Sequence, residues 1–400
     1  MKKNFSPPLA LVQTPAPLGA HHAGRADEKP APTATSSSSE LMKSTWRPSW
    51  EREQRKPRFV KDEPITTAAG STSPYGKKQY LWGNVPALDI LHLSHNEGAA
   101  HTQPIHLLFA ASGDLRNAIR TTTALPTATP HPPLTALLND RAFPLAARNA
   151  LLLLAALHVS PPSLAAATIL HTWYSFLLPA AVAGALRRDV FPLVDGVCEE
   201  VADEPPRSVV SRVFARGEAS VRVVLEKEGW VALRGWLDLG GGGGGVTVEE
   251  ARGVRGETVG AEARRDYVER MLFCQPCGGW RVAVGKWRRE GVLVPFGAGV
   301  AGFDVPNPTM FQERGVWPMM DSADPLAGWP LDEVLRKTGV AKNDIYGGLF
   351  FYLIEVFVDF CERILTRKID FVLLNVDAVD LPETLAKDMS LPQSFDRIEV

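Results

Sequence analysis

The chain has 400 residues, of which 45% are apolar and 22% are charged, a balance typical of a globular protein with a substantial core. Its 43 lysines and arginines against 45 aspartates and glutamates leave a formal charge of −2, so no global charge attracts it to nucleic acid or to an anionic membrane. Four cysteines are too few for a disulfide-built secreted domain, and prolines interrupt any signal-peptide core. These features favour a cytoplasmic protein, with the nucleus as the alternative compartment.

Residues 1–75 are predicted to be a disordered, low-complexity tail. The stretch 31–39 is rich in Pro, Thr and Ser, and few aliphatic residues recur at helix or strand spacing. A basic patch at 47–61 includes Trp50 and Phe59. A partner-binding or nucleic-acid-contacting segment is the alternative interpretation of this patch, but such charge runs are usually solvated surface, which we prefer.

Order is expected from about residue 80 to residue 400, in one α/β domain. Its first elements are predicted as strand, helix, strand and helix at residues 105–110, 115–124, 134–138 and 144–157. Pro144 suits the first turn of a helix, where its missing N–H has no partner to lose. The alternation is the βαβ signature of a parallel sheet.

The next segment, 164–186, is apolar and long enough to span a membrane, with His171 as its only strongly polar residue. Pro179 interrupts the run and arginines flank one end alone, so a buried core helix is the preferred interpretation. A spanning helix is the alternative.

The middle of the chain is predicted to form an insertion. An amphipathic helix is expected over 209–239, followed by a glycine-rich surface insertion near 240–256. The run of six glycines is not a phosphate loop, because it lacks the Lys-Ser/Thr ending. A second helix is expected over 264–273, and a β-hairpin or meander over 280–296.

The last part of the chain has the strongest periodicity. A long helix is predicted over 344–365 with Asp344 as its N-cap, followed by a buried strand at 369–376. Another strand is expected at 395–400. No capping segment follows it, so we expect a domain that is cut short at its C-terminus.

Several motifs are specific enough to indicate a family. They are YLWGNVPALD at residues 80–89, LLFAASGDLRN at 107–117, NDRAFPLAARN at 139–149 and WPMMDSADPLAGW at 317–329. These motifs resemble a fungal family defined as domain of unknown function 4470, to which the N-terminal domain of dynein axonemal assembly factor 3 is similar. The resemblance implies a Rossmann-like, methyltransferase-like fold and no particular reaction.

The ends of the first two predicted strands carry the candidate cofactor site. In parallel sheets, ligands bind at the carboxyl ends of strands, a helix N-terminus offers free N–H groups, and an acidic residue after the second strand binds ribose hydroxyls. The candidate cofactor-binding residues are therefore Ser112, Gly113, Asp114, Asn139 and Asp140.

A structural role competes with cofactor binding at each position. The loop has one glycine where cofactor loops usually have several, and Asp114 would repel a phosphate although it could receive the amino group of a methionine moiety. Capping of a helix by Ser112 or Asp114 is preferred. For Asp140, pairing with Arg141 or Arg148, or capping of its own helix, is likewise preferred.

No other constellation indicates chemistry. Cys274 and Cys277 form one CxxC, which is half of a zinc site, and two unpaired thiols are the preferred interpretation. We predict no metal site, and no catalytic residue can be assigned because neither a nucleophile elbow nor metal-ligand histidine spacing occurs.

Three functions remain open at this stage. A module that binds or assembles an unidentified protein partner is preferred. An S-adenosylmethionine-dependent methyltransferase, with S-adenosylmethionine as the candidate cofactor, is the alternative. A membrane-associated protein, attached through residues 164–186, is the second alternative, although we expect contact with neither membrane nor nucleic acid.

Overall fold

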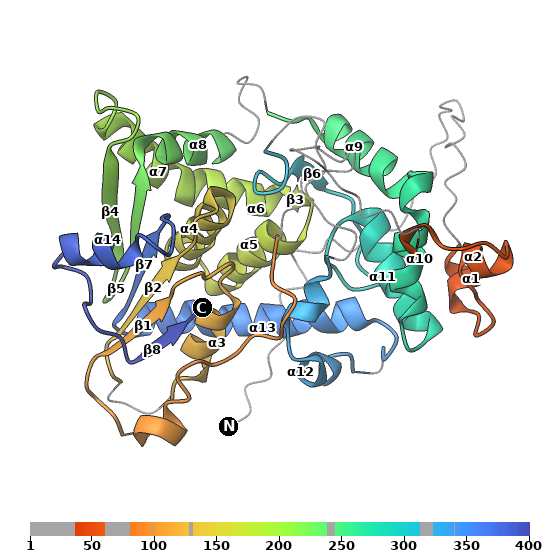
Figure 1. Cartoon of the computed structure of the whole chain (residues 1–400), viewed down its shortest axis with the longest axis horizontal. Helices are drawn as coiled ribbons and strands as arrows, with labels where there is room; N and C mark the ends of the chain where they lie inside the picture. The colour runs from red at the N-terminus through yellow and green to blue at the C-terminus, as the bar shows by residue number, and fades with distance from the viewer. Residues whose placement is uncertain are drawn as a thin grey trace, which may run out of the picture.

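The computed structural model describes residues 37–60, 81–98, 100–127, 131–237, 245–312, 323–339 and 341–400. Within these residues, a six-stranded sheet is covered by helices and continues into a helical lobe (Figure 1). Its strands are, in spatial order, β4 (Val209–Arg216), β5 (Ala219–Glu226), β7 (Ile369–Leu374), β2 (Leu134–Asn139), β1 (Ile105–Phe109) and β8 (Arg397–Glu399). Every pairing is parallel except that of β4 with β5. The predicted α/β class with a mostly parallel sheet is confirmed.

The strand order reverses between β1 and β8. From β1 the chain passes through α3 (Arg116–Ala124) to β2, then forms β4 and β5 at that edge of the sheet and returns inward to β7, which lies between β5 and β2. After β7 it passes through α14 (Leu381–Lys387) and returns to the other side of β1 as β8. β2 and β8, which the chain reaches by separate connections, therefore flank β1 on opposite sides, and in parallel sheets ligands bind at the carboxyl ends of strands near such a reversal of strand order.

The two faces of the sheet bury alternate residues, as strand geometry requires. Ile105, Leu107 and Phe109 of β1 lie in the main core, to which α4 (Phe143–His158), α5 (Pro162–Tyr174) and α13 (Ile345–Thr366) contribute. The alternate residue Leu108 joins a smaller cluster with α14, together with Leu137, Val372, Leu374, Leu381, Leu385 and Leu391. Each fully buried aliphatic side chain favours folding by about 1.5–3 kcal/mol, so both faces stabilise the sheet.

The remaining elements surround this framework. The other α-helices are α1 (Ser38–Met42), α2 (Ser49–Arg52), α6 (Ala180–Ala185), α7 (Phe191–Glu200), α8 (Lys227–Leu237), α9 (Val248–Gly260), α10 (Arg265–Phe273), α11 (Gly278–Glu290) and α12 (Leu331–Leu335). Short 3-10 and π turns are η2 (Arg58–Val60), η3 (Ser94–Gly98), η4 (Leu186–Val190), η5 (Glu262–Arg264) and η6 (Pro325–Gly328). A separate antiparallel pair consists of β3 (Leu177–Pro179) and β6 (Phe303–Pro306).

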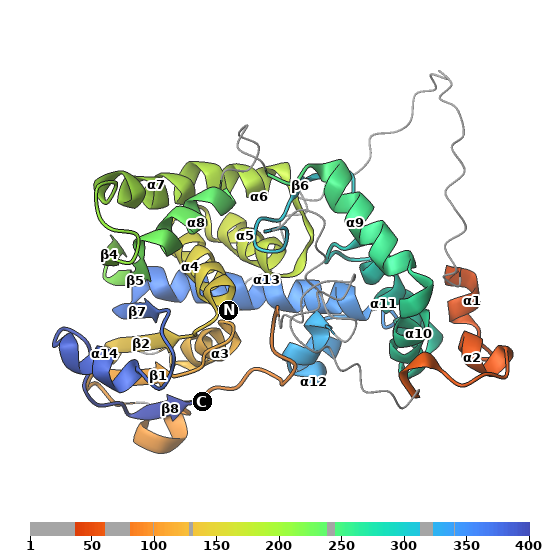
Figure 2. The same ribbon diagram turned by 45° about the horizontal axis from the view of Figure 1, so that its top comes forward.

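A helical lobe lies at the opposite end of the molecule from the sheet. Figure 2 shows α9, α10 and α11 together there, with α1 and α2 on their outer side and α13 running from the sheet toward them. The N-terminal segment, residues 37–60, contacts this lobe through α1 against α11 and through α2 and η2 against α10.

Most elements predicted from periodicity are present. β1, α3, β2, α4, α10, α13, β7 and β8 begin and end close to their expected positions. Pro144 lies in the first turn of α4, and the side chain of Asp344 accepts a hydrogen bond from the Gly347 N–H at 2.8 Å as the N-cap of α13. These predictions are confirmed because each rests on a local pattern.

The helix expected over 209–239 is wrong for most of its length. β4 and β5 form an antiparallel hairpin there, and only the last part is helical, as α8. The turn contains Gly217 at φ +64°, a left-handed conformation that favours glycine. Burial alternates along β5, with Val221, Val223 and Leu225 inside, which is a strand period that the many valines also favour.

The hairpin expected over 280–296 is also wrong. This segment forms α11, which buries Ala283, Val284 and Trp287 on one face and ends at Gly291, a left-handed C-cap at φ +71°. Helical spacing of the buried residues therefore decides its structure. The hairpin in this domain is β4–β5, which belongs to the main sheet because β5 pairs with β7.

The segment 164–186 does not form a single helix. It divides into α5, β3 and α6, and most of its side chains are buried in the main core. Pro179, which the sequence identified as an interruption, is the N-cap of α6. Among the described residues, no helix has the length and apolar character needed to cross a membrane.

The tail predicted over residues 1–75 is corrected at 37–60. These residues form α1, α2 and η2, and Leu41, Trp46 and Ser49 are buried. The rest of that prediction lies outside the described residues. Likewise, most of the glycine run falls outside them, and the second half of the predicted 240–256 insertion is helical, as part of α9.

Candidate functional site

A cleft of about 350 Å³ lies at the carboxyl ends of β1 and β8, where the strand order reverses. Its floor is the loop that leaves β1 and the first turn of α3, and its rim is the segment 82–88. The cleft is lined by Trp82, Gly83, Val85, Pro86, Leu88, Ala111, Ser112, Gly113, Asp114, Arg116, Asn117, Leu145 and Glu399. Three of the five predicted cofactor residues therefore line it, while Asn139 and Asp140 support the loop from beneath.

The loop after β1 is held against the end of β2 by its own N–H groups. Gly113 has φ +55°, which turns its N–H toward the Asp140 carboxylate, and the distance to Oδ2 is 3.0 Å. The Ser112 N–H donates to the Asn139 carbonyl at 2.8 Å. These two N–H groups are consequently engaged within the protein and do not point at a ligand.

Asp140 does not cap its own helix as expected, because the N-cap of α4 is Ala142 and no side chain bonds the free N–H groups of its first turn. Instead, Asp140 Oδ1 accepts from the Ala142 N–H at 2.8 Å, in the turn just before α4. The expected arginine partners bind elsewhere: Arg141 lies 3.5 Å from Asp377, and the fully buried Arg148 donates to the carbonyls of Leu81 and Thr309. Both Asp140 oxygens thus accept backbone N–H groups.

Asp114 forms a buried ion pair with Arg116. Arg116 Nε lies 2.8 Å from each Asp114 oxygen, and both residues are 7% exposed. Asp114 also accepts the Gly83 N–H at 2.8 Å. Arg116 Nη1 donates to the carbonyls of Val85 and Gly328. This pair therefore fastens the rim of the cleft to the sheet, and its charges cancel locally.

Asn139 joins the ends of three strands. Its amide Nδ2 donates to the carbonyls of Ala110 and Val376 at 3.0 and 3.1 Å, and its Oδ1 accepts the Val376 N–H at 3.1 Å. The residue is 1% exposed. Its hydrogen bonds therefore set the spacing of the loops that follow β1, β2 and β7.

Glu399 is the cleft residue that the sequence did not indicate. Its Oε1 accepts from Asn117 Nδ2 at 3.0 Å, whereas its Oε2 is buried without a hydrogen-bond partner among the described residues. Burial raises the pKa of Glu399, and the negative charge of Asp114 adds to this, while Asn117 and Arg116 oppose it. A carboxylate oxygen in such surroundings favours a donor or a cation beside it.

The two cysteines of the CxxC lie between α10 and α11, with Cys274 exposed and Cys277 half-buried. Cys274 is the C-cap of α10 and Cys277 is the N-cap of α11, and both thiols are free. Within the described ranges, no group of three or more His, Cys, Asp or Glu side chains could hold a metal ion.

The fold and the cleft define a mixed α/β domain with a mostly parallel sheet and a ligand-sized cleft at the carboxyl edge of that sheet. Residues 81–178 match the family model described as Domain of unknown function (DUF4470), which covers β1, α3, β2, α4 and α5 together with the loop that floors the cleft. The match supports the family resemblance predicted from the motifs. No curated protein and no solved structure matches the chain.

Proposed function

We propose that this domain is a protein-binding module whose cleft holds a basic side chain of a partner, flanked by aliphatic residues. The single observation that carries the proposal is Glu399, a half-buried carboxylate in the cleft lining whose Oε2 has no donor in the part of the chain that the structure describes. Because Arg116 neutralises Asp114, Glu399 gives the cleft one uncompensated negative charge. A lysine or arginine of a partner, placed in the cleft beside this carboxyl group, would supply the opposite charge.

The rim of the cleft supports a protein partner. Val85 and Leu88 are 62% and 56% exposed, and both line the cleft. Exposed aliphatic side chains beside a partly buried charge are typical of binding surfaces, because a partner can cover the apolar area while it pairs the charge. The expected similarity to a dynein axonemal assembly factor also favours an assembly role.

The loop after β1 favours protein binding over the binding of a nucleotide cofactor. A phosphate-binding loop presents free N–H groups to its ligand. Here the N–H groups of Ser112, Gly113 and Arg116 donate to Asn139, Asp140 and Asp114, respectively. The polar groups that the sequence suggested for a cofactor thus hold the loop in shape, as in a scaffold.

S-adenosylmethionine-dependent methyl transfer is a second candidate function, favoured by the position of the cleft. In doubly wound sheets of the Rossmann-like kind, ligands bind where the strand order reverses, which is where this cleft lies. Glu399 could then receive the ammonium group of the methionine moiety. Ribose hydroxyls, however, would have to compete with two backbone N–H groups for Asp140.

Fluorescence anisotropy with two labelled peptides tests the binding function. A peptide of alternating leucine and lysine should bind the whole chain, and a leucine–glutamate peptide should not. Glu399→Gln should raise the dissociation constant of the leucine–lysine peptide about tenfold or more, since a charge-assisted interaction is lost. Glu383→Gln, an exposed carboxylate on α14, is the matched control. Equal binding of both peptides, or no change in Glu399→Gln, would contradict the proposal.

Calorimetry with S-adenosylmethionine separates the two candidates. Binding to the wild-type chain that is lost in Glu399→Gln and kept in Glu383→Gln would favour the methyltransferase. The protein-binding function predicts no heat of binding with this ligand.

A further inference from the structure

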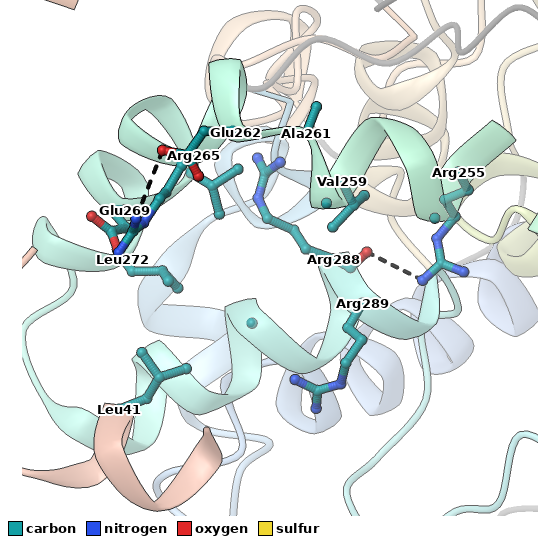
Figure 3. Close-up of a pocket in the computed structure, with 14 residues that line it drawn as sticks. Leu41, Arg255, Val259, Ala261, Glu262, Arg265, Glu269, Leu272, Arg288 and Arg289 are labelled. Carbon is teal, nitrogen blue, oxygen red and sulfur yellow. Dashed lines mark hydrogen bonds and ion pairs between the residues drawn. The ribbon is translucent and has the colours of Figure 1, made fainter. Parts of the chain in front are cut away.

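A second cavity, of about 150 Å³, lies in the helical lobe between α9, α10 and α11. Leu41 of α1 closes one side of it, so the N-terminal segment contributes to its wall. It shares no lining residue with the cleft at β1 and β8. Figure 3 shows the side chains that surround it. The cavity is therefore an independent site.

One end of this cavity is apolar. Leu41 and Leu272 lie together at that end in Figure 3, and they are 3% and 6% exposed. Val268 of α10 and Val259 of α9 add aliphatic surface. Gly285 of α11 lets Leu41 pack closely against the helix, because a Cβ at this position would lie only 3.1 Å from Leu41 Cδ1. An aliphatic chain fits such a wall better than water does.

The other end is basic. Arg255 of α9 lies there, away from the two leucines (Figure 3), and Arg289 of α11 also lines the cavity. Arg255 Nη2 donates to the Arg288 carbonyl at 3.2 Å, but its Nε is buried without a hydrogen-bond partner among the described residues. Burial lowers the pKa of Arg255 to about 10, with Glu290 opposing and the like charges of Arg289 and Arg252 adding to the effect.

The acidic residues of the lining do not neutralise these arginines. Glu269 accepts the N–H and Oγ of Ser49 at 2.5 and 2.6 Å and lies 3.5 Å from Arg265. Glu262 lies 3.6 Å from Arg58 and 3.7 Å from Arg265. These two carboxylates thus hold the N-terminal segment and η5, and Glu290, which favours the charged form of Arg255, lies 3.7 Å from Lys286.

We propose that this cavity binds an unbranched aliphatic monocarboxylate, with its carboxylate at Arg255 and Arg289 and its chain toward Leu41 and Leu272. The guanidinium groups of these two lining residues supply N–H donors of the kind that a carboxylate requires. An apolar cavity of this volume holds a ligand about as large as benzene, so a chain of about six to eight carbons fits. A small inorganic anion would leave the apolar end unfilled.

Calorimetry with sodium octanoate, octanol and octylammonium tests this site on the whole chain. Octanoate should bind with one-to-one stoichiometry. Octanol should bind about tenfold or more weakly, because it lacks the charge, and octylammonium should not bind. Equal binding of octanoate and octanol, or displacement of octanoate by equimolar sulfate, would overturn the proposal.

Substitutions locate the site. Arg289→Gln changes an exposed side chain, so the variant should keep its fold. Its affinity for octanoate should fall about tenfold. Arg187→Gln, an exposed arginine on η4 far from the lobe in sequence, is the matched control and should bind as the wild type does. Val259→Phe should fill the cavity and abolish binding at an unchanged melting temperature. Wild-type affinity in both Arg289→Gln and Val259→Phe would overturn the proposal.

Discussion

Arg55 and Asp266 form a bidentate ion pair across 211 residues of sequence, with Nη1 and Nη2 donating to the two carboxylate oxygens at 2.6 and 2.7 Å. Asp266 is fully buried and also accepts the Arg58 N–H at 2.7 Å. A buried carboxylate requires such donors, since it has lost its water. This pair, together with Glu269 and Ser49, fixes the N-terminal segment on α10.

Removing this carboxylate should release the N-terminal segment. In Asp266→Ala, Arg55 loses its partner, and we expect the free energy of unfolding to fall by about 1–3 kcal/mol, less than for a fully enclosed pair because Arg55 reaches solvent. Denaturant unfolding measures the loss, and limited proteolysis should cut within 43–60 faster. Glu51→Gln is the matched control, since it breaks the exposed Arg47–Glu51 pair and should change little.

The Arg55–Asp266 pair should also make the attachment of the N-terminal segment to α10 sensitive to acid. The hydrogen bond from Arg55 holds the pKa of Asp266 below its usual value. The folded state therefore binds this proton less readily than the unfolded state does, and the stabilisation is present above the ordinary aspartate pKa and lost as pH falls below it. Protease protection of 43–60 that stays constant down to pH 2 would contradict this.

A buried histidine should add a second acid dependence, which begins at a higher pH than that of Asp266. His171 is 6% exposed, hydrogen-bonds Ser175 at 3.0 Å through Nδ1, and has its pKa lowered to about 3 by burial. Between that value and the unfolded value near 6.5, the unfolded state binds one more proton, so stability should fall on acidification by up to about 1.4 kcal/mol per pH unit. Urea midpoints between pH 7 and pH 5 measure it. His171→Gln should flatten the slope over this range.

The fold could be predicted where a local pattern decides it. α13 has a long apolar stripe and a capping aspartate, and β1 and β2 are short apolar runs bounded by turns. The hairpin at 209–226 was missed although its sequence carries the signal, since its valines favour a strand and Gly217 suits the left-handed turn position. The docking of 37–60 depends on Asp266 and Glu269, which no local pattern connects to Arg55 and Ser49.

The sequence predicts where the candidate site lies better than it predicts what its residues do. The ends of β1 and β2 do lie together, as parallel strands require, so Ser112, Gly113 and Asp140 are neighbours. Their hydrogen bonds to one another could not be inferred from their spacing. Glu399 was missed because it reaches the cleft only through the pairing of β8 with β1, a contact across almost the whole domain.

We expect Asn139 to stabilise the fold through its hydrogen bonds. Asn139→Ala removes the bonds to Ala110 and Val376 and leaves buried backbone groups unpaired, so we expect a loss of about 2–4 kcal/mol. Ser112→Ala, which keeps the backbone bond to Asn139, is the matched control and should cost less than about 1 kcal/mol. Thermal unfolding compares them. A large loss in Ser112→Ala with none in Asn139→Ala would mean that the loop is held in another way.

Gly291 should tolerate alanine less well than Gly113 does, although both have positive φ. A left-handed alanine costs about 1–2 kcal/mol, and Gly113→Ala should lose only this, because nothing lies within 4 Å of the added Cβ. At Gly291 the Cβ would lie 2.5 Å from the ring of Phe176, which is buried, and 2.8 Å from Arg255 Nε. Overpacking adds about 1–3 kcal/mol, so Gly291→Ala should be the more destabilised in denaturant unfolding. Equal losses in the two variants would show that α11 can shift away from Phe176, and the wall of the second cavity would then be less rigid than its contacts indicate.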